Sequence, residues 1–435
     1  MKFLRVLAVL VLCFSLNAKF KQGSIIVDAR AEALVTKILE RLCKANNRKS
    51  TPKIYFIVDD SINAFATDEG SIYIHTGLVM KLEDVGQLVA VLAHELGHII
   101  GGHIHRFRGE SMGISAASII GTLLGGAAAL AGGGGDALVA GILLGQGAAQ
   151  GQFASFTRTH EKEADASAYR TLQAAGLSAS GAIRVFKYFK KIMAFSEPPY
   201  LKTHPSDDDR IKAFENYIKQ TPDTGFMPEE WVTEFENIKA IFIANLHQAK
   251  DADKRYGEKQ SPDAMLAQAI ILSRRGQHKE AFARLDALLA KDPNNPYLYE
   301  MYGQFLLESG RANSKKSVEK LKKAVELAPN ALSIRLLYAQ ALYNSGTDSN
   351  VELALAELNR ITEEDKRNAM AWLLKVGIYS KLKQHAEADL AQAEYANITG
   401  DKKLATSRAK RASKSSNDRV KKKVKLLEDA IKEDA

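Results

Sequence analysis

The stretch LVAVLAHELGHII, residues 88–100, decides the fold of the first half of the chain. It is apolar nearly throughout, as a buried helix is, yet it carries His94, Glu95 and His98. Two histidines four positions apart lie on one face of a helix, so both imidazoles can reach one ion. Glu95 can then take a proton from a zinc-bound water, which is the chemistry of HExxH helices. Because a buried helix does not carry such groups without partners, the stretch predicts a metal centre.

A catalytic zinc takes three protein ligands and keeps one open position, so a third ligand must come from elsewhere. A longer pattern on the same segment would require a histidine at position 104. That residue is Ile104, and the flanking His103 and His105 are each out of register by one. The third ligand is therefore expected further along the chain.

The downstream segment HEKEAD, residues 160–165, supplies the better candidate. Glu161 can coordinate zinc, and Asp165, one helical turn later, can accept a hydrogen bond from a ligand imidazole. His160 is the alternative ligand in this segment. Glu163 is expected to point away from the centre as a solvated charge.

The residues around the HExxH helix predict an α+β domain, mainly helical and zincin-like, with a small β-sheet. Segments 53–59 and 71–75 are rich in β-branched and aromatic residues, which favours strands. Apolar residues recur at helical spacing between Ser24 and Asn46. Gly101 and Gly102 are typical of a helix end, so we expect a helix over 85–101. Further helices are expected over 155–175, over 179–195 and from Asp209.

A glycine- and alanine-rich tract interrupts this domain. Residues 101–151 hold fifteen of the chain's thirty glycines, and Asp136 is the only charged residue from 111 to 157. The two apolar arms are shorter than the roughly 20 residues that a transmembrane helix needs. We therefore interpret 111–152 as a lid or a membrane-surface element, with a packed pair of small-residue helices as the alternative.

The N-terminus predicts export. Lys2 and Arg5 precede an apolar run that is too short to span a bilayer, and Ala18 offers a cleavage site, so residues 1–18 are expected to be a signal peptide. A lipoprotein signal at Cys13 is less favoured, because bulky Leu12 precedes it. The formal charge of +9 is concentrated in residues 401–435, predicted to be a basic helix or tail. For an exported chain this excludes nucleic acid and leaves contact with an anionic surface open.

The second half of the chain predicts helix pairs. Small and large residues recur with a spacing of 36 residues between Pro293 and Pro329, close to the 34-residue tetratricopeptide unit. Two looser copies follow, and together they favour a solenoid over a generic helical bundle. Such repeats stack into a concave surface that binds segments of other chains. The expected domains are thus a peptidase domain over 19–245 and an all-α tetratricopeptide-like solenoid over 246–400.

Six ordered motifs resemble the HtpX-type and CAAX-prenyl-protease-type zinc metallopeptidases, of gluzincin kind. They are Asn63-Ala-Phe-Ala66, Gly70-Ser-Ile-Tyr-Ile74, Gly77-Leu78, His94-Glu-Leu-Gly-His98, Glu161-Lys-Glu-Ala-Asp165, and Thr203-His-Pro205 with Arg210. The signal peptide and the helical repeats make the chain similar to the periplasmic β-barrel assembly-enhancing protease group. Those proteases help outer-membrane proteins to assemble and degrade stalled ones.

The resemblance implies a role for each matching residue. One zinc ion per subunit would be held by His94, His98 and Glu161. Glu95 would be the general base, and Asp165 would support a ligand. The substrate backbone would pair with an edge strand formed by Asn63, Ala64, Phe65 and Ala66.

Two further residues have two competing interpretations. The resemblance implies that His204 can occupy the open zinc position and hold the enzyme latent, and that Arg210 can steady the oxyanion. The local sequence favours a loop leading into a helix, with a surface ion pair to Asp207 or Asp208.

The resemblance therefore predicts a periplasmic zinc-dependent metalloendopeptidase that cleaves misfolded or stalled envelope proteins. Its expected partners are unfolded or partly assembled outer-membrane proteins, the outer-membrane assembly machinery through the repeats, and the membrane surface as a peripheral contact. The alternatives are a non-proteolytic chaperone or assembly scaffold with a latent zinc site, and a membrane-embedded protease that uses the glycine-rich tract as a hairpin.

Overall fold

The computed structural model describes residues 22–67, 70–103, 147–193, 200, 204, 208–221 and 223–433. The predicted signal peptide and most of the predicted 111–152 segment lie outside these residues. The chain forms two compact units, which meet in sequence at Ile270 and Ile271. Within the described ranges, no helix combines the length and the apolar character that a membrane crossing requires.

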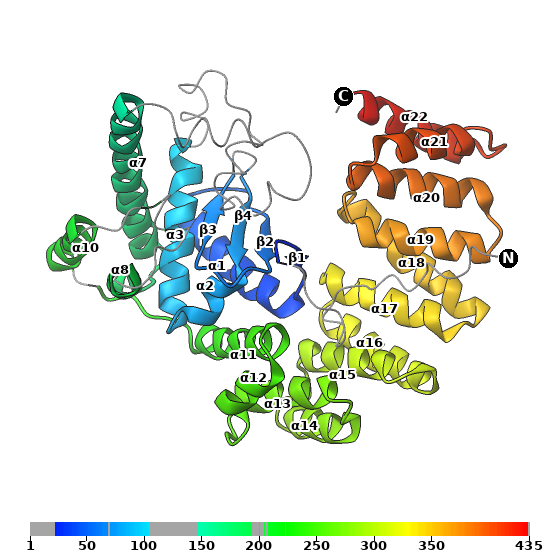
Figure 1. Cartoon of the computed structure of the whole chain (residues 1–435), viewed down its shortest axis with the longest axis horizontal. Coiled ribbons are helices and arrows are strands. Elements are labelled where there is room, and N and C mark those ends of the chain that lie inside the picture. The colour runs from blue at the N-terminus through cyan, green and yellow to red at the C-terminus, as the bar shows by residue number, and fades with distance from the viewer. Residues whose placement is uncertain are drawn as a thin grey trace. The chain divides into compact units, whose positions relative to one another are not determined.

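The first unit contains a small sheet and a set of helices (Figure 1). Its elements are β1 (Ile25–Ile26), α1 (Ala29–Ala45), β2 (Ile54–Ile57), β3 (Ala64–Ala66), β4 (Ile72–His75), α2 (Thr76–Lys81), α3 (Val85–Gly101), α7 (Gly147–Ala174), α8 (Ser180–Met193), α10 (Asp208–Gln220), α11 (Glu229–Leu246) and α12 (Ala249–Tyr256).

The four strands lie in the order β1-β2-β4-β3. β2 and β4 are parallel, whereas β1 and β3 run antiparallel to their neighbours. Strand β3 pairs with β4 alone, with Phe65 opposite Tyr73, so it forms one edge of the sheet. The two strands expected from β-branched and aromatic residues are β2 and β4, and the Asn63–Ala66 segment supplies the edge, as the resemblance implied.

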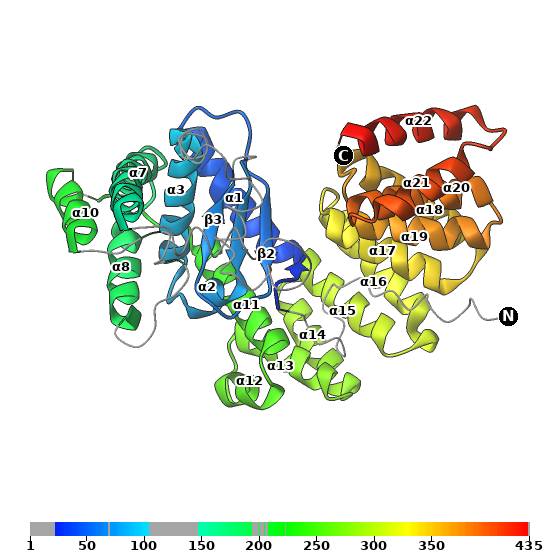
Figure 2. The same ribbon diagram turned by 45° about the horizontal axis from the view of Figure 1, so that its top comes forward.

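Helix α3 lies between the sheet and α7 (Figures 1 and 2). It begins at Asp84, whose side chain accepts a hydrogen bond from the Gln87 N–H, and it ends at Gly102 in the left-handed region, with φ of +62°. Every residue from Val85 to His98 is buried. An all-round buried helix has no solvent face, which explains why its sequence is apolar on every side.

The second unit consists of helix pairs stacked one upon the next (Figure 2). Its helices, starting with the one that spans the boundary, are α13 (Pro262–Arg274), α14 (His278–Lys291), α15 (Pro296–Glu308), η2 (Arg311–Asn313), α16 (Ser314–Leu327), α17 (Leu332–Ser345), α18 (Asp348–Glu364), α19 (Ala369–Lys381), α20 (His385–Ile398), α21 (Lys402–Ala412) and α22 (Asp418–Glu433).

The period of this unit is that of tetratricopeptide repeats. The first helices of successive pairs, α13, α15, α17, α19 and α21, begin 34, 36, 37 and 33 residues apart. Small residues permit the close approach within a pair, since a Cβ added to Gly303 would lie 2.4 Å from Leu321 Cγ. The predicted fold class, a mainly helical α+β domain with a small sheet followed by helical repeats, is therefore confirmed.

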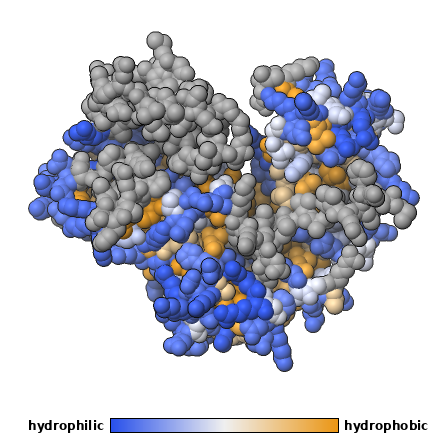
Figure 3. Space-filling view, viewed as in Figure 1, coloured by the Kyte–Doolittle hydropathy of each residue, from blue (hydrophilic) through white to orange (hydrophobic). Residues whose placement is uncertain are grey.

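The repeat pattern continues further than the sequence suggested. Residues 401–435 were expected to be a basic helix or tail, but α21 and α22 form a fifth helix pair. Ala409, Val420 and Val424 are buried against Leu390 of the preceding pair. Hydrophilic side chains dominate the described surface on the face shown in Figure 3, with smaller apolar patches among them.

Candidate metal centre

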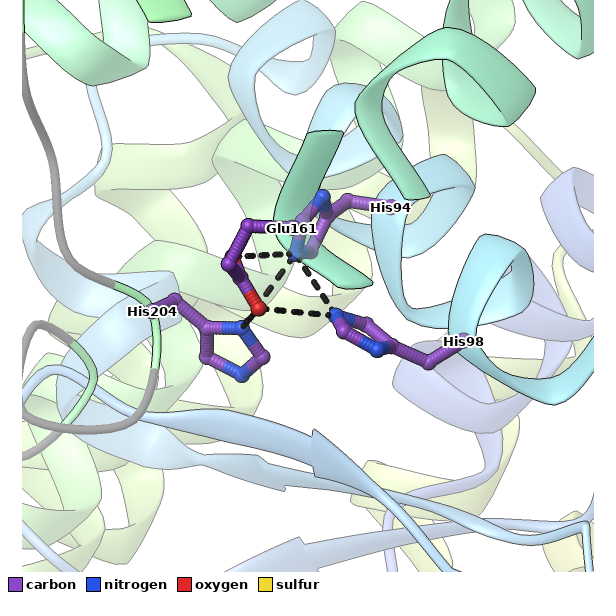
Figure 4. A group of neighbouring side chains, drawn as sticks. All are labelled: His94, His98, Glu161 and His204. Atoms are coloured by element: carbon purple, nitrogen blue, oxygen red, sulfur yellow. Dashed lines mark hydrogen bonds and ion pairs between the residues drawn. The ribbon is translucent and has the colours of Figure 1, made fainter. Parts of the chain in front are cut away.

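Four buried side chains bring ligand atoms together at the centre of the first unit (Figure 4). His94 and His98 come from α3, Glu161 comes from α7, and His204 lies between α8 and α10. One ligand atom from each of the four lies within 4.8 Å of the others. No other group of this kind occurs among the described residues.

The spacing of these atoms fits a tetrahedral metal ion. The Nε2 atoms of His94 and His98 are 3.0 Å apart, and each is 3.2 Å from a Glu161 oxygen. Bonds of 2.0–2.1 Å to zinc would place tetrahedral ligands about 3.3 Å apart. A buried carboxylate between two imidazoles is also the donor set that suits zinc. The residues present therefore fit the ion that the HExxH motif predicted.

A close helix contact brings Glu161 to this place. A Cβ added to Gly97 on α3 would lie 2.8 Å from the Ala164 carbonyl oxygen on α7, so only glycine permits the observed approach. Glu161 and Asp165, one turn apart on α7, both face α3 at this contact. The packing of α3 against α7 therefore requires a glycine at position 97, between the two ligand histidines, where α3 meets Ala164 beside Asp165.

Asp165 supports His94 from behind. Its Oδ1 accepts a hydrogen bond from His94 Nδ1 at 2.9 Å, so that Nε2 faces the other ligands. Arg210 on α10 donates to both Asp165 oxygens, at 2.7 Å each, and its Nη1 lies 3.0 Å from Glu161 Oε2. The guanidinium also lies over the Phe186 ring, 4.5 Å from its centre. Arg210 therefore holds two of the predicted site residues in place.

The local interpretation of Arg210 and His204 as surface ion-pair partners is wrong. Arg210 is 4% exposed and His204 is 6% exposed. Asp208 pairs instead with Lys190 on α8. The aspartates next to Arg210 in the sequence could not reveal its burial, because its partner Asp165 comes from a distant part of the chain. The predicted contact of Arg210 with an oxyanion stays a prediction.

Glu95 lies between the metal ligands and the edge strand. It is 1% exposed, and its Oε2 accepts a hydrogen bond from the Ala66 N–H of β3 at 3.0 Å. Its Oε1 lies 3.6 Å from His204 Nε2 and makes no hydrogen bond with any described residue. Burial raises the pKa of Glu95, which His204 and His94 partly oppose. A carboxylate with a raised pKa holds a proton more readily near neutral pH.

Burial and neighbouring charges shift the pKa values of the two imidazoles of α3 in opposite directions. Burial alone would lower the pKa of His94, but the Glu161 and Asp165 carboxylates raise it to about 9. Burial lowers the pKa of His98 to about 3, although Glu161 opposes this shift. Glu161 itself is buried, yet His204 and His94 hold its pKa well below its usual value. Without an ion, His94 is therefore the protonated one of these two imidazoles near neutral pH, and His98 is neutral.

His204 reaches the centre through a short backbone link to the sheet. Its N–H donates to the Tyr200 carbonyl at 2.8 Å, and the Tyr200 N–H donates to the Ile62 carbonyl just before β3. His204 Nδ1 lies 2.9 Å from Glu161 Oε1 and 3.2 Å from His94 Nε2. His204 therefore belongs to the group of four side chains that could hold an ion.

Three residues near the centre were missed or interpreted differently from the sequence. His103 contacts the outer nitrogen of His98, and Glu163, expected to point away, contacts His103 at 3.1 Å. His160, the alternative ligand, lies outside the four-residue group and stacks on the His103 ring, 4.5 Å away. The sequence signal that could have placed His103 beside His98 is Gly101-Gly102, because a glycine in the left-handed region reverses the chain direction after a helix.

An HExxH helix and a carboxylate from a later helix define the metallopeptidase class, and comparison with known proteins agrees. The profile of Peptidase family M48 matches residues 29–218. This part of the chain is therefore a Peptidase family M48 domain, a metalloprotease domain, which confirms the resemblance seen in the sequence.

Several curated relatives that are named as proteases are similar to parts of this chain. The chain is 28% identical over 287 residues to a "Putative beta-barrel assembly-enhancing protease" of Vibrio cholerae, covering 63% of this chain and 58% of that protein. It is 26% identical over 370 residues to the "Beta-barrel assembly-enhancing protease" of Escherichia coli, covering 83% of this chain and 74% of that protein. The "Metalloprotease LoiP" of Escherichia coli is 30% identical over 172 residues, which cover 38% of this chain and 63% of LoiP.

Among solved structures, the likeness is to repeat proteins. The tetratricopeptide protein YrrB, described as having an unusual peptide-binding site, has a TM-score of 0.30 and 20% identity, and the match covers 53% of this chain and all of YrrB. Yeast Tom70 has a TM-score of 0.37 and 13% identity, with coverage of 61% and 53% respectively. Both TM-scores are below 0.5, and we infer nothing further from these likenesses.

Proposed function

We propose that this protein is a periplasmic zinc-dependent endopeptidase that cleaves misfolded or stalled envelope proteins. The observation that carries the proposal is the convergence of His94, His98 and Glu161 on one point beside the buried carboxylate of Glu95. Their separations of 3.0–3.2 Å match the edges of a metal tetrahedron. One zinc ion per subunit would be held there.

The proposed chemistry is hydrolysis of a peptide bond. Zinc, when bound, would polarise the scissile carbonyl and make water a better nucleophile. Glu95 would accept the proton from the attacking water at Oε1, the oxygen that makes no hydrogen bond with described residues. The raised pKa makes its carboxylate a stronger base for this step, and the resulting carboxylic acid would then give the proton to the departing amine nitrogen. Asp165 and Arg210 would keep His94 and Glu161 oriented throughout.

Strand β3 would position the substrate. An edge strand can receive an extended peptide through backbone hydrogen bonds, and β3 is the edge nearest to Glu95. Its members Ala64, Phe65 and Ala66, with Asn63 directly before them, would thus align the scissile bond with the centre. Hydrogen bonds along the backbone do not read sequence, which would suit a protease that acts on many unfolded clients.

The substitution Glu95→Gln tests the proposal. It keeps the size of the side chain but removes the base, so we expect casein cleavage to fall by about 10³-fold or more while zinc content stays near one per chain. Glu40→Gln, at an exposed position on α1, is the matched control and should cleave like the wild type. Chelation should abolish the activity of the wild type. Undiminished cleavage by purified Glu95→Gln protein would refute the assignment.

We propose that His204 holds the enzyme latent. Its Nδ1 lies where a water would have to enter, and the Tyr200–Ile62 hydrogen bond ties its segment to the approach of the substrate edge. We expect His204→Ala to raise basal casein cleavage several-fold, because an open corner is required for hydrolysis. Unchanged or lower cleavage, measured at equal zinc content, would argue against latency. The exposed His385→Ala is a control of the same type in the repeats.

The repeat unit would hold clients or the outer-membrane assembly machinery. Stacked tetratricopeptide-like pairs bind segments of other chains, and relatives that carry the name beta-barrel assembly-enhancing protease support this role. The alternative is a scaffold in which proteolysis is dispensable. Complementation of a deletion strain separates the two: rescue by Glu95→Gln would favour the scaffold, and failure to rescue would favour the protease.

A further inference from the structure

The two ligand histidines of α3 are supported differently on the side away from the centre. His94 Nδ1 donates directly to Asp165, a buried carboxylate that Arg210 also holds. The outer nitrogen of His98 faces an imidazole instead of a carboxylate. This nitrogen, Nδ1, lies 3.0 Å from Nδ1 of a second imidazole, His103, which is 3% exposed. The opposite nitrogen of His103, Nε2, lies 3.1 Å from Glu163 Oε2.

The direction of each hydrogen bond in the series His98–His103–Glu163 follows from its metal-facing end, which is His98 Nε2. A ring nitrogen that offers its lone pair to a metal carries no proton, so neutral His98 must carry its proton on Nδ1. His103 Nδ1 is then the acceptor, which leaves the His103 proton on Nε2. That N–H donates to Glu163, which as a carboxylate can only accept. Each donor thus meets one acceptor, and no other arrangement of neutral rings satisfies both contacts.

From this we propose that His103 is a positioning residue for the metal ligand His98, and that Glu163 in turn orients His103. The inference rests on the proposed zinc site. His103 would fix both the tautomer of His98 and the direction of its ring, as a partner behind a metal-bound histidine commonly does. Without it, His98 Nδ1 would be a buried donor that lacks this acceptor, and the ring could turn its lone pair away from the ion.

The backbone is built to bring His103 back towards His98. Gly102 adopts φ of +62°, and its N–H closes the helix onto the Ile99 carbonyl at 3.2 Å. The next residue then folds over the last turn of α3. A Cβ added to Gly101 would lie 2.2 Å from His103 Nε2, so the ring occupies space that any other residue type at this position would fill.

A second contact holds the His103 ring against α7. The His160 ring lies parallel to it, with an interplanar angle of 7° and the centres 4.5 Å apart. His160 and Glu163 come from the same turn of α7 that supplies Glu161. The turn that provides the third ligand therefore also orients the second one, through an imidazole from the end of α3.

Zinc affinity tests the inference, because it responds to ligand orientation independently of turnover. We would measure the dissociation constant of zinc by competition with a chromophoric chelator for the full chain. His103→Phe keeps the ring but removes both hydrogen bonds, so affinity should fall about 10–100-fold. His103→Gln can accept at its oxygen and donate at its nitrogen, so it should recover most of the loss. Lys162→Gln, an exposed neighbour of Glu163, should bind zinc like the wild type.

A second variant and a second measurement guard against loss of folding. Glu163→Gln, at a half-exposed position, leaves the core intact, and it should weaken zinc binding by several-fold. The visible spectrum of the cobalt-substituted protein should change in His103→Phe and resemble the wild type in His103→Gln. A merely structural role would lower the unfolding temperature of the metal-free protein without this difference between phenylalanine and glutamine.

The outcomes separate the inference from the proposed function. If His103→Phe and Glu163→Gln both bind zinc within twofold of the wild type, the inference is overturned. If His98→Ala also binds zinc like the wild type, the proposed metal site itself is wrong. Should His103→Phe fail to fold, Glu163→Gln and His103→Gln decide: weaker binding in the former with near-normal binding in the latter supports the role, and wild-type affinity in both refutes it.

Discussion

The two units of this protein solve opposite packing problems. The metal centre buries seven polar residues, His94, Glu95, His98, Glu161, Asp165, His204 and Arg210, each at most 8% exposed. The repeat core around α17, α18 and α19 is made of aliphatic and small side chains, such as Ala339, Leu342, Val351, Ala354 and Leu358. One region depends on directed polar contacts and the other on apolar area removed from water.

This difference teaches where a substitution should act. A buried polar group needs a partner at one distance and angle, so a small displacement removes its function. Apolar contacts are non-directional and roughly proportional to area, so a change there alters stability in proportion to the volume lost. We therefore expect the centre to lose chemistry before it loses its fold, and the repeats to lose stability before they affect chemistry.

The chain offers a separate probe of each unit. Its only two tryptophans are Trp231 on α11 of the first unit and Trp372 on α19 of the second. Replacing one of them by phenylalanine leaves a fluorescence signal that reports the unfolding of the other unit. The predictions below use these two backgrounds.

The largest expected effect is on the stability of the repeats. Leu358→Ala removes a side chain that is 0% exposed in the core of α18, which should cost about 2–5 kcal/mol of unfolding free energy. Cleavage of a short peptide and zinc content should stay unchanged. Urea unfolding followed through Trp372 measures the loss, and Leu353→Ala on the same helix, 52% exposed, is the control. A parallel loss of peptide cleavage would break the comparison.

A matched pair of glycine substitutions sharpens the comparison between the two units. Gly97→Ala brings a Cβ to 2.8 Å from the Ala164 carbonyl, and Gly303→Ala brings one to 2.4 Å from the Leu321 side chain. Each should cost about 1–3 kcal/mol in its own unit. Only Gly97→Ala should also lower peptide cleavage, by about 10–100-fold, since a shift of α7 moves Glu161. Equal activity in the two variants would show that the helix spacing is not what positions the ligand.

The last expected effect is one of sign, because the stability of the two units should change with pH in opposite directions. His94 has its pKa raised from 6.5 to about 9, so its contribution to the stability of the metal-free first unit is complete below pH 6.5 and is lost as the pH rises to 9. Burial lowers the pKa of Lys375 from 10.5 to about 8. The unfolded repeats therefore bind more protons between pH 8 and 10.5, and the stability of this unit should rise with pH there.

Unfolding of the metal-free protein at pH 6.5, 8, 9 and 10 measures how the free energy of unfolding of each unit changes with pH. Trp231 reports the first unit and Trp372 the second. The changes should be on the order of 1 kcal/mol per unit of pKa shift. Zinc should remove the trend in the first unit, because a coordinated imidazole stays neutral. Lys375→Met should remove the trend in the second. Trends of the same sign in both units would contradict the opposite environments of the two groups.

Much of the architecture could be predicted from local patterns. The helix over 85–101, the strands that became β2 and β4, and the helix pairs depend on periodicity, β-branched residues and glycine stops, all of which act between near neighbours in the chain. The candidate site was also visible in part, because the spacing of His94 and His98 needs only one helical turn. Glu161 and Asp165 followed from the same rule applied to α7.

The remaining contacts depend on where distant segments meet. The local sequence pairs Arg210 with a surface aspartate, whereas the packing of α10 places it against Asp165, 45 residues away in the sequence. His103 is one position out of register for the longer histidine pattern, and the local sequence predicts that Glu163 points away from the centre. The left-handed turn at Gly102 and the packing of α7 on α3 changed both.

The sequence by itself determined the helices, the strands and the pair of histidines that can share an ion, because these follow from interactions within a few residues. Only the tertiary structure decided which side chains meet behind those histidines, namely Arg210 at Asp165 and His103 at His98. The physical reason is that a hydrogen bond depends on distance and angle within tenths of an ångström, and packing between distant segments sets both.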